Sequence, residues 1–162
     1  MIIVSNTSPI TSLSVIGLFD VLHHLYAKIH IPEGVWQELN AYGKSWPGSS
    51  EVAKADWIEK HRPQNQALVR ALQRDLDLGE SETISLALEL QADLVLLDEK
   101  PGRRAAQRFG LRPLGVVGIL LEAKKAALIL HIRPHLDALR EEAGFYISEA
   151  LFHAVLLQAD EQ

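Results

Sequence analysis

The stretch DLVLLD, residues 93–98, decides the fold class of this chain. Its four central residues are apolar without a break, whereas a strand with one face in water alternates apolar and polar residues. Unbroken apolarity predicts a strand that is buried on both faces, as in a parallel sheet covered by helices. Asp98 follows this strand directly and therefore stands where a parallel sheet exposes the carboxyl ends of its strands.

Other short apolar runs, separated by segments of helical periodicity, fit the same plan. We expect further strands over residues 2–5, 28–31, 56–61 and 111–114, and helices over residues 10–16, 18–26, 32–42, 64–75, 80–91, 101–109, 115–127, 133–142 and 148–157. Alternation of strands and helices predicts an α/β fold with three layers, α/β/α, and a short, mainly parallel sheet of four to five strands. Residues 43–50 are rich in Gly, Ser and Pro, and we expect an excursion or lid there.

Length and composition limit the classes of protein that remain. A chain of 162 residues and 18.0 kDa fits a single domain, residues 1–162, and 48% apolar residues suffice for a packed core. Cysteine is absent, which excludes disulfides and thiolate metal sites and, with no targeting segment recognised, points to the cytoplasm. A net charge of −5 argues against a protein that coats nucleic acid, although a local basic patch remains compatible with it.

Four polar residues are candidates for one site. Asn6 ends the first expected strand and Asp98 ends the buried one, so right-handed crossovers place both at the same sheet edge. Glu80 shares a helix face with apolar residues four, seven and eight positions later, and Glu38 shares a half-buried face with its apolar neighbours. Glu82 lies on the other side of its helix and is a weaker candidate. We expect the first four side chains to meet in one pocket.

The chemistry of this set favours a divalent cation. Carboxylates that point toward a core are costly unless a cation pairs with them, and ligands that are all oxygen favour Mg²⁺ or Mn²⁺ over Zn²⁺. Taken singly, each position has an ordinary structural explanation, because Glu on a helix is usually solvated and Asp after a strand often forms a turn or a cap.

Several pieces of the chain, in order, resemble PIN-domain proteins, and most closely the prokaryotic PIN-like proteins that are similar to VapC-type toxin ribonucleases. The pieces are VSNTSP at 4–9, IPEGVWQEL at 31–39, LGESE at 78–82, LLDE at 96–99, GVVGIL at 115–120 and FYIS at 145–148. The resemblance implies a metal-dependent ribonuclease with an acidic pocket at the carboxyl edge of a parallel sheet.

Carried over by position, the acidic residues of the family fall on Asn6, Glu38, Glu80 and Asp98, with Glu38, Glu80 and Asp98 as metal ligands. The departure is Asn6, because an aspartate is usual at this position in active members and asparagine offers only a neutral carbonyl. The alternative is therefore a catalytically weakened module that binds nucleic acid or protein.

Auxiliary roles remain open at four positions. Glu82 or Glu99 would supply a replacement carboxylate, and Thr7 or Ser8 would orient a water or ligand, although hydroxyls before Pro9 more often cap a helix.

A basic run follows Asp98 directly: Lys100, Arg103, Arg104 and Arg108. This run is equally consistent with a surface that binds the RNA phosphate backbone and with a solvated helix face. The seven histidines lack ligand spacing and are expected to be surface or structural residues. The three tryptophans are expected to pack in the core or against a partner.

Partners follow partly from the resemblance, which implies an RNA substrate, a homodimer and a small antitoxin protein that blocks the pocket. The segment 150–157 is apolar almost all round, so a face left over from the core would form the dimer interface. A phospho-acceptor regulator with Asp98 as acceptor is disfavoured, because the first strand ends in Asn6 and no early acidic pair is present.

Overall fold

A computed structural model of the protein describes residues 1–41 and 46–161. Its centre is a sheet of five parallel strands in the order β3-β2-β1-β4-β5. The strands are β1 (Ile3–Ser5), β2 (Ile29–Pro32), β3 (Ile58–His61), β4 (Leu94–Leu96) and β5 (Pro113–Leu114). The expected fold class is thus confirmed, with five strands that are all parallel.

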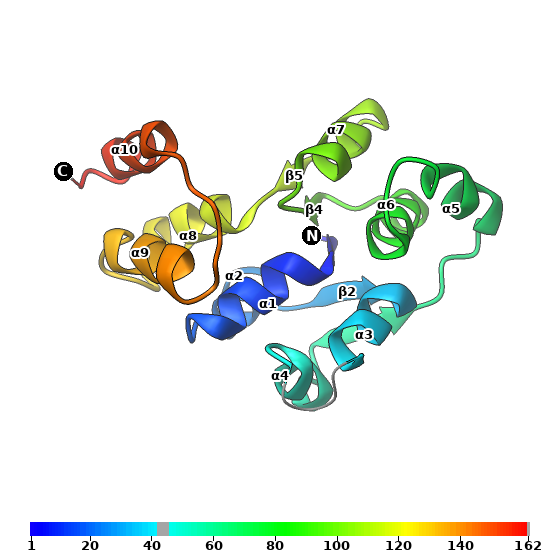
Figure 1. Ribbon diagram of the computed structural model, residues 1–162. Helices are drawn as coiled ribbons and strands as arrows, with labels where there is room; N and C mark the ends of the chain where they lie inside the picture. Colours follow the sequence, from blue (N-terminus) through cyan, green and yellow to red (C-terminus); the bar gives the residue numbers. More distant parts are fainter. Residues whose placement is uncertain (42–45, 162) are drawn as a thin grey trace.

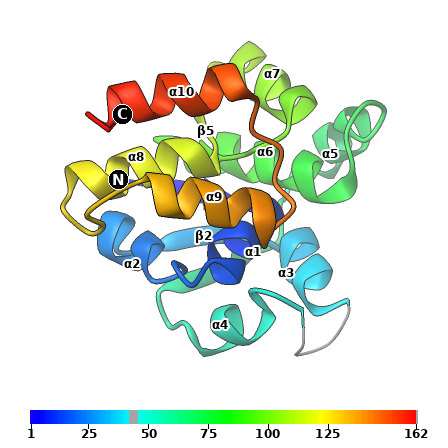
Figure 2. The same cartoon turned by 60° about the vertical axis from the view of Figure 1, so that its left-hand side comes forward.

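Helices cover both faces of this sheet and produce the three layers (Figure 1). In Figure 1, α5, α6 and α7 gather on one side of the strands and α8, α9 and α10 on the other, and Figure 2 shows the latter three side by side. None of the helices in the described ranges is long and apolar enough to cross a membrane. Their bounds are α1 (Thr7–Val15), α2 (Val21–Tyr26), α3 (Glu33–Asn40), α4 (Ser49–Lys54), α5 (Gln66–Leu72), α6 (Leu78–Leu90), α7 (Lys100–Arg108), α8 (Val116–Lys125), α9 (Arg133–Glu141) and α10 (Glu149–Gln158).

The β4 strand has an apolar core on each side, as its unbroken apolarity predicts. Val95, Leu96 and Leu97 are completely buried. Leu96 belongs to the larger core, which α1, α2, α8 and α10 also line, whereas Val95 and Leu97 pack with α6 and α7. Strand residues alternate between faces, so consecutive apolar residues can be buried only when both faces are covered.

Two local boundaries differ from those expected. Residues 43–50 do not form only a loop, because α4 begins at Ser49; Gly43 and its neighbours through residue 45 lie outside the described residues. Helix α1 begins earlier than expected: Asn6 holds the N-cap position and Thr7 and Ser8 lie inside the first turn. The sequence favoured a hydroxyl cap because Ser and Thr are common at that position.

The end of the chain is held by one carboxylate. Glu161 accepts hydrogen bonds from Ile132 N at 2.6 Å and Arg133 N at 3.1 Å, and it pairs with Lys124 Nζ at 2.7 Å. Partial desolvation alone raises the pKa of Glu161, but these hydrogen bonds outweigh it and lower that pKa to about 2. The carboxylate therefore ties the last residues to α8 and to the start of α9.

We expect Glu161→Gln to lower the free energy of unfolding by about 2 kcal/mol at neutral pH, since bonds to a charged acceptor contribute about 1.5–3 kcal/mol. A depressed pKa stabilises the fold above pH 4.5, the ordinary value, and this stabilisation is lost as pH falls toward 2. The difference between variant and wild type should therefore shrink in acid. Urea denaturation at neutral pH and in acid measures this difference in stability. The control is Glu142→Gln, at a residue on the exposed surface. Equal stability of Glu161→Gln and wild type at neutral pH would contradict the assignment.

Candidate metal centre at the carboxyl edge of the sheet

Asn6 and Asp98 lie at the carboxyl ends of two adjacent strands. Strand β1 pairs with β4, with Ser5 opposite Leu96, and the Asn6 backbone N–H donates to the Leu96 carbonyl at 3.0 Å. Asn6 is 7% exposed, so its amide side chain is held against the interior. The sheet topology thus brings these two residues to one edge, as the sequence predicts.

The first turn of α1 connects two of the candidate carboxylates. Thr7 Oγ1 donates to Glu38 Oε2, and Ser8 Oγ donates to Asp98 Oδ2 at 3.0 Å. The two hydroxyls do not cap the helix, because their bonds go to side chains from α3 and from the loop after β4. They instead hold Glu38 and Asp98 beside the chain segment that follows Asn6.

Glu80 is placed by the start of α6. Its backbone N–H donates to Asp77 Oδ1 at 2.8 Å and its Oε1 accepts from the Asp77 N–H at 3.3 Å, which together form a capping box. One oxygen is thereby used for the helix. The other, Oε2, is buried and has no hydrogen-bond partner.

The glycine before Glu80 brings Asn6 and Glu38 close to the same helix start. A Cβ atom at Gly79 would lie 3.3 Å from Asn6 Oδ1 and 3.4 Å from Glu38 Oε1. Glu38 itself is exposed rather than half-buried, so its carboxylate reaches Gly79 from the solvent-exposed side of the sheet edge. Glycine leaves room for the two oxygen atoms to approach the backbone of α6.

Asp98 is fixed at the start of α8. Val116 N donates to Asp98 Oδ1 at 2.7 Å, while Ser8 holds the other oxygen. A Cβ at Gly115 would come within 2.9 Å of Asp98 Oδ1, so this approach requires glycine. Both oxygens of Asp98 therefore have defined directions.

Burial makes the carboxylates of Glu80 and Asp98 costly to ionise. Burial raises the pKa of Glu80 to about 7, and the negative charges of Asp77 and Glu99 add to the effect of burial. Burial also raises the pKa of Asp98, although the bonds from Val116 N and Ser8 lower it. Perturbed carboxyl groups of this kind are typical of functional sites, and a nearby cation favours their charged form.

The residues present fit a divalent metal ion. Asn6 Oδ1 and Glu80 Oε2 are buried oxygen atoms without a hydrogen-bond partner, and every candidate donor is an oxygen. The carboxylates of Glu38, Glu80 and Asp98 do not place three oxygens within 4.8 Å of one another. Mg²⁺ commonly keeps several waters and takes only one or two carboxylates directly, so these carboxylates would hold it partly through water.

Of the two proposed replacement carboxylates, Glu82 has another partner. Its Oε1 accepts the Gly34 N–H at 2.6 Å near the start of α3. Glu82 lies on the other side of α6 from Glu80, as expected, and it is buried there, with 8% of its surface exposed. Helix α6 is enclosed by β1, β2, α3, α5 and α7, which buries it on nearly all sides. Glu99 is exposed at the N-cap position of α7.

The basic run lies on α7 and divides into two parts. Arg103 Nη1 donates to the Leu97 carbonyl at 3.3 Å and so stays beside Asp98. Lys100, Arg104 and Arg108 are exposed, and the two arginines line a surface cleft of about 520 Å³ between α5 and α7.

The tryptophans behave as the sequence predicts. Trp36, Trp46 and Trp57 are half-buried and pack against the larger core. Trp57 also contacts the ring of Phe19, with 5.1 Å between ring centroids.

One cluster was missed by sequence reasoning. Among residues 1–41 and 46–161, His30, Glu59 and His61 are the set of three potential metal-binding side chains whose ligand atoms lie within 4.8 Å of one another. The signal in the sequence was the spacing of Glu59 and His61, which puts both on one face of an expected strand. The pairing of that strand with the one containing His30 was needed to complete the cluster.

The fold is an α/β domain with acidic side chains gathered at the carboxyl edge of its parallel sheet. The chain belongs to the PIN-domain family, because a family model described as a PIN domain matches residues 2–161. No curated protein matches the sequence significantly. PIN domains are in general nucleases that use divalent metals.

Glu80 allows a test of this geometry. A Cβ at Gly102, in the first turn of α7, would lie 2.8 Å from Glu80 Oε2, the atom that has no hydrogen-bond partner. We expect Gly102→Ala to fold, because the end of a flexible side chain can move, and to weaken Mn²⁺ binding about tenfold by displacing that oxygen. Isothermal titration calorimetry measures the affinity, with Ala105→Gly on the same helix as the control. Unchanged affinity in Gly102→Ala would exclude Glu80 Oε2 as a ligand.

Proposed function

We propose that the protein is an endoribonuclease that depends on Mg²⁺ or Mn²⁺ and hydrolyses RNA phosphodiester bonds at the carboxyl edge of the sheet. Glu38, Glu80 and Asp98 hold the metal directly or through coordinated water, and Asn6 contributes a neutral carbonyl oxygen. The observation that carries the proposal is the pair of buried oxygens, Asn6 Oδ1 and Glu80 Oε2, that have no hydrogen-bond partner beside this edge. Unpaired buried polar atoms are costly, so a ligand for them is expected.

The surrounding residues hold this site in shape. Thr7 and Ser8 keep Glu38 and Asp98 at fixed positions through their hydroxyl groups, and the Val116 N–H fixes the second oxygen of Asp98. When bound, the metal supplies charge neutralisation at the scissile phosphate and lowers the pKa of a coordinated water.

The exposed side chains of Lys100, Arg104 and Arg108 are the proposed contacts to the RNA backbone, with Arg103 closest to Asp98. Their positive charge offsets the net charge of −5 where the substrate approaches. RNA affinity should therefore fall as salt concentration rises.

We further propose a toxin–antitoxin role in the cytoplasm, with a homodimer and a small antitoxin partner. Phe152, Val155 and Leu156 of α10 are buried in the larger core of the same chain, while Leu151 and Leu157 remain 43% and 62% exposed. Both leucines border the exposed side of α10, which is the side that a second copy would cover.

Light scattering at micromolar concentration should return twice the chain mass of 18.0 kDa. Leu157→Glu should return a single chain, because it places a charge in the proposed interface. A wild-type species of one chain mass that does not change with concentration would contradict the dimer.

The second candidate function is a module that binds nucleic acid or a protein without efficient hydrolysis. The observation that favours it is Asn6, which reduces the charge available to a cation.

Incubation with end-labelled RNA distinguishes the two functions. The nuclease predicts cleavage with Mg²⁺ or Mn²⁺ that stops with EDTA, and weaker or no cleavage of single-stranded DNA of the same sequence. Binding of RNA without cleavage in either metal supports the module.

A further inference from the structure

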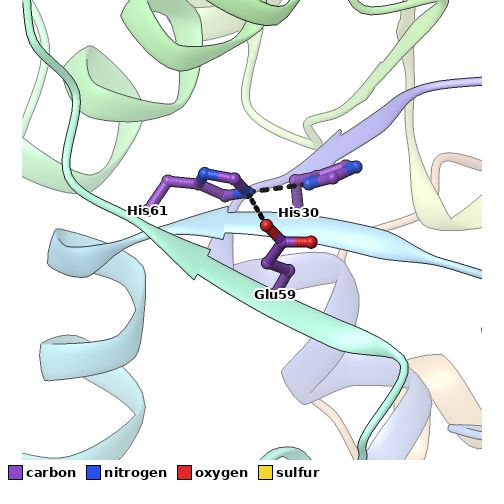
Figure 3. A group of neighbouring side chains, drawn as sticks. All are labelled: His30, Glu59 and His61. Atoms are coloured by element: carbon purple, nitrogen blue, oxygen red, sulfur yellow. Dashed lines mark hydrogen bonds and ion pairs between the residues drawn. The ribbon is translucent and has the colours of Figure 1, made fainter.

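We propose that His30, Glu59 and His61 form a second metal site, which binds one transition-metal dication of the Zn²⁺ type and joins strand β3 to strand β2. Figure 3 shows the three side chains converging from these two strands. One ligand atom from each residue lies within 4.8 Å of the other two.

The register of the sheet creates this convergence. His30 pairs with Glu59 and Pro32 pairs with His61 in the parallel ladder between β2 and β3. Paired residues point to the same face of a sheet, and residues two apart on one strand do so as well. All three side chains therefore project from one face of the sheet. Val4 on β1 pairs with His30 and points to the same face.

The distances match a small metal ion after minor adjustment. His30 Nδ1 lies 2.8 Å from His61 Nε2, and His61 Nε2 lies 3.5 Å from Glu59 Oε1. Two ligands at about 2.0–2.1 Å from a tetrahedral Zn²⁺ are separated by about 3.3 Å. The imidazoles thus need to part by only about half an ångström.

The ligand types in this cluster favour a different metal from the one that the acidic edge favours. Two imidazoles and one carboxylate suit Zn²⁺, with a fourth position left for water, whereas Mg²⁺ prefers oxygen. Lys28 Nζ bonds Glu59 Oε2 at 2.5 Å and leaves Oε1 directed at His61.

The position of this cluster, between β2 and the edge strand β3, gives a bound metal a structural role. Strand β3 stands at the end of the strand order in the described part of the chain, next to β2, and its Glu59 and Lys60 are exposed. An edge strand presents unpaired backbone groups and is the strand most easily lost or mispaired. A metal held by both strands would fix β3 in register and raise the thermal stability of the fold.

The test is a Zn²⁺ titration of the full chain, freed of metal, against a chromophoric chelator. Wild type should bind one equivalent with a dissociation constant of about 1 μM or tighter, and its melting temperature should rise. His61→Asn and Glu59→Gln should each weaken binding at least about tenfold. Glu59 is exposed, so its variant should remain folded even if His61→Asn does not.

Two controls separate this site from the rest of the molecule. His153→Asn removes an exposed histidine on α10, and Asp98→Asn disables the acidic edge; both should keep the affinity of wild type. The proposal is overturned if Zn²⁺ does not bind at micromolar concentration, if Glu59→Gln changes affinity less than tenfold, or if Asp98→Asn abolishes binding.

Discussion

The Asp98→Asn variant is expected to cleave RNA at least about 100-fold more slowly than wild type while keeping its fold. Asparagine can still accept the Val116 N–H bond and contact Ser8, so the packing around residue 98 is preserved. It removes a full negative charge from the proposed ligand set, and divalent cations depend on ligand charge for affinity. The loss should therefore appear in metal affinity and in cleavage rate together.

The matched control is Asp56→Asn, the same chemical change at an exposed residue before β3. Single-turnover cleavage at saturating RNA measures the rate, and calorimetry with Mn²⁺ measures the affinity. If Asp98→Asn cleaves as fast as Asp56→Asn, Asp98 does not take part in the reaction.

The Asn6→Asp variant is expected to bind Mn²⁺ at least about tenfold more tightly than wild type. Asn6 Oδ1 is buried, has no hydrogen-bond partner, and lies like Glu38 Oε1 beside Gly79 at the start of α6. A carboxylate there adds charge to the cation site, and tenfold in affinity corresponds to about 1.4 kcal/mol. The same charge repels neighbouring carboxylates when the metal is absent.

Thermal melting gives a second readout of Asn6→Asp with opposite signs. The variant should melt below wild type in EDTA and gain more stability than wild type from added Mn²⁺. The control is Asn40→Asp at the exposed end of α3. Affinity for Mn²⁺ that is unchanged or weaker would show that residue 6 lies outside the metal site.

The sequence predicted those parts of the molecule that depend on local pattern. Unbroken apolarity at 94–97 identified a strand buried on both faces, and its parallel setting placed Asn6 and Asp98 at one edge. The PIN-domain family was also recognised from ordered short motifs. The functional roles of the four edge residues stay predictions.

The rest depends on tertiary contacts that local pattern does not contain. Thr7 and Ser8 resemble helix caps in sequence, yet their hydroxyls bond carboxylates 31 and 90 residues away. The burial of Glu82 could not be predicted from its helix alone, because it follows from the elements that enclose α6 on nearly all sides. The histidine cluster required the register of β2 against β3, which periodicity alone does not define.

A crystal soaked in Mn²⁺ and measured for anomalous scattering tests the central claim most directly. We expect a Mn²⁺ peak at the carboxyl edge, in contact with Asn6, Glu80 or Asp98 directly or through water, with Glu38 at its rim. Anomalous density elsewhere on the molecule, with none at this edge, would contradict the proposed metal centre.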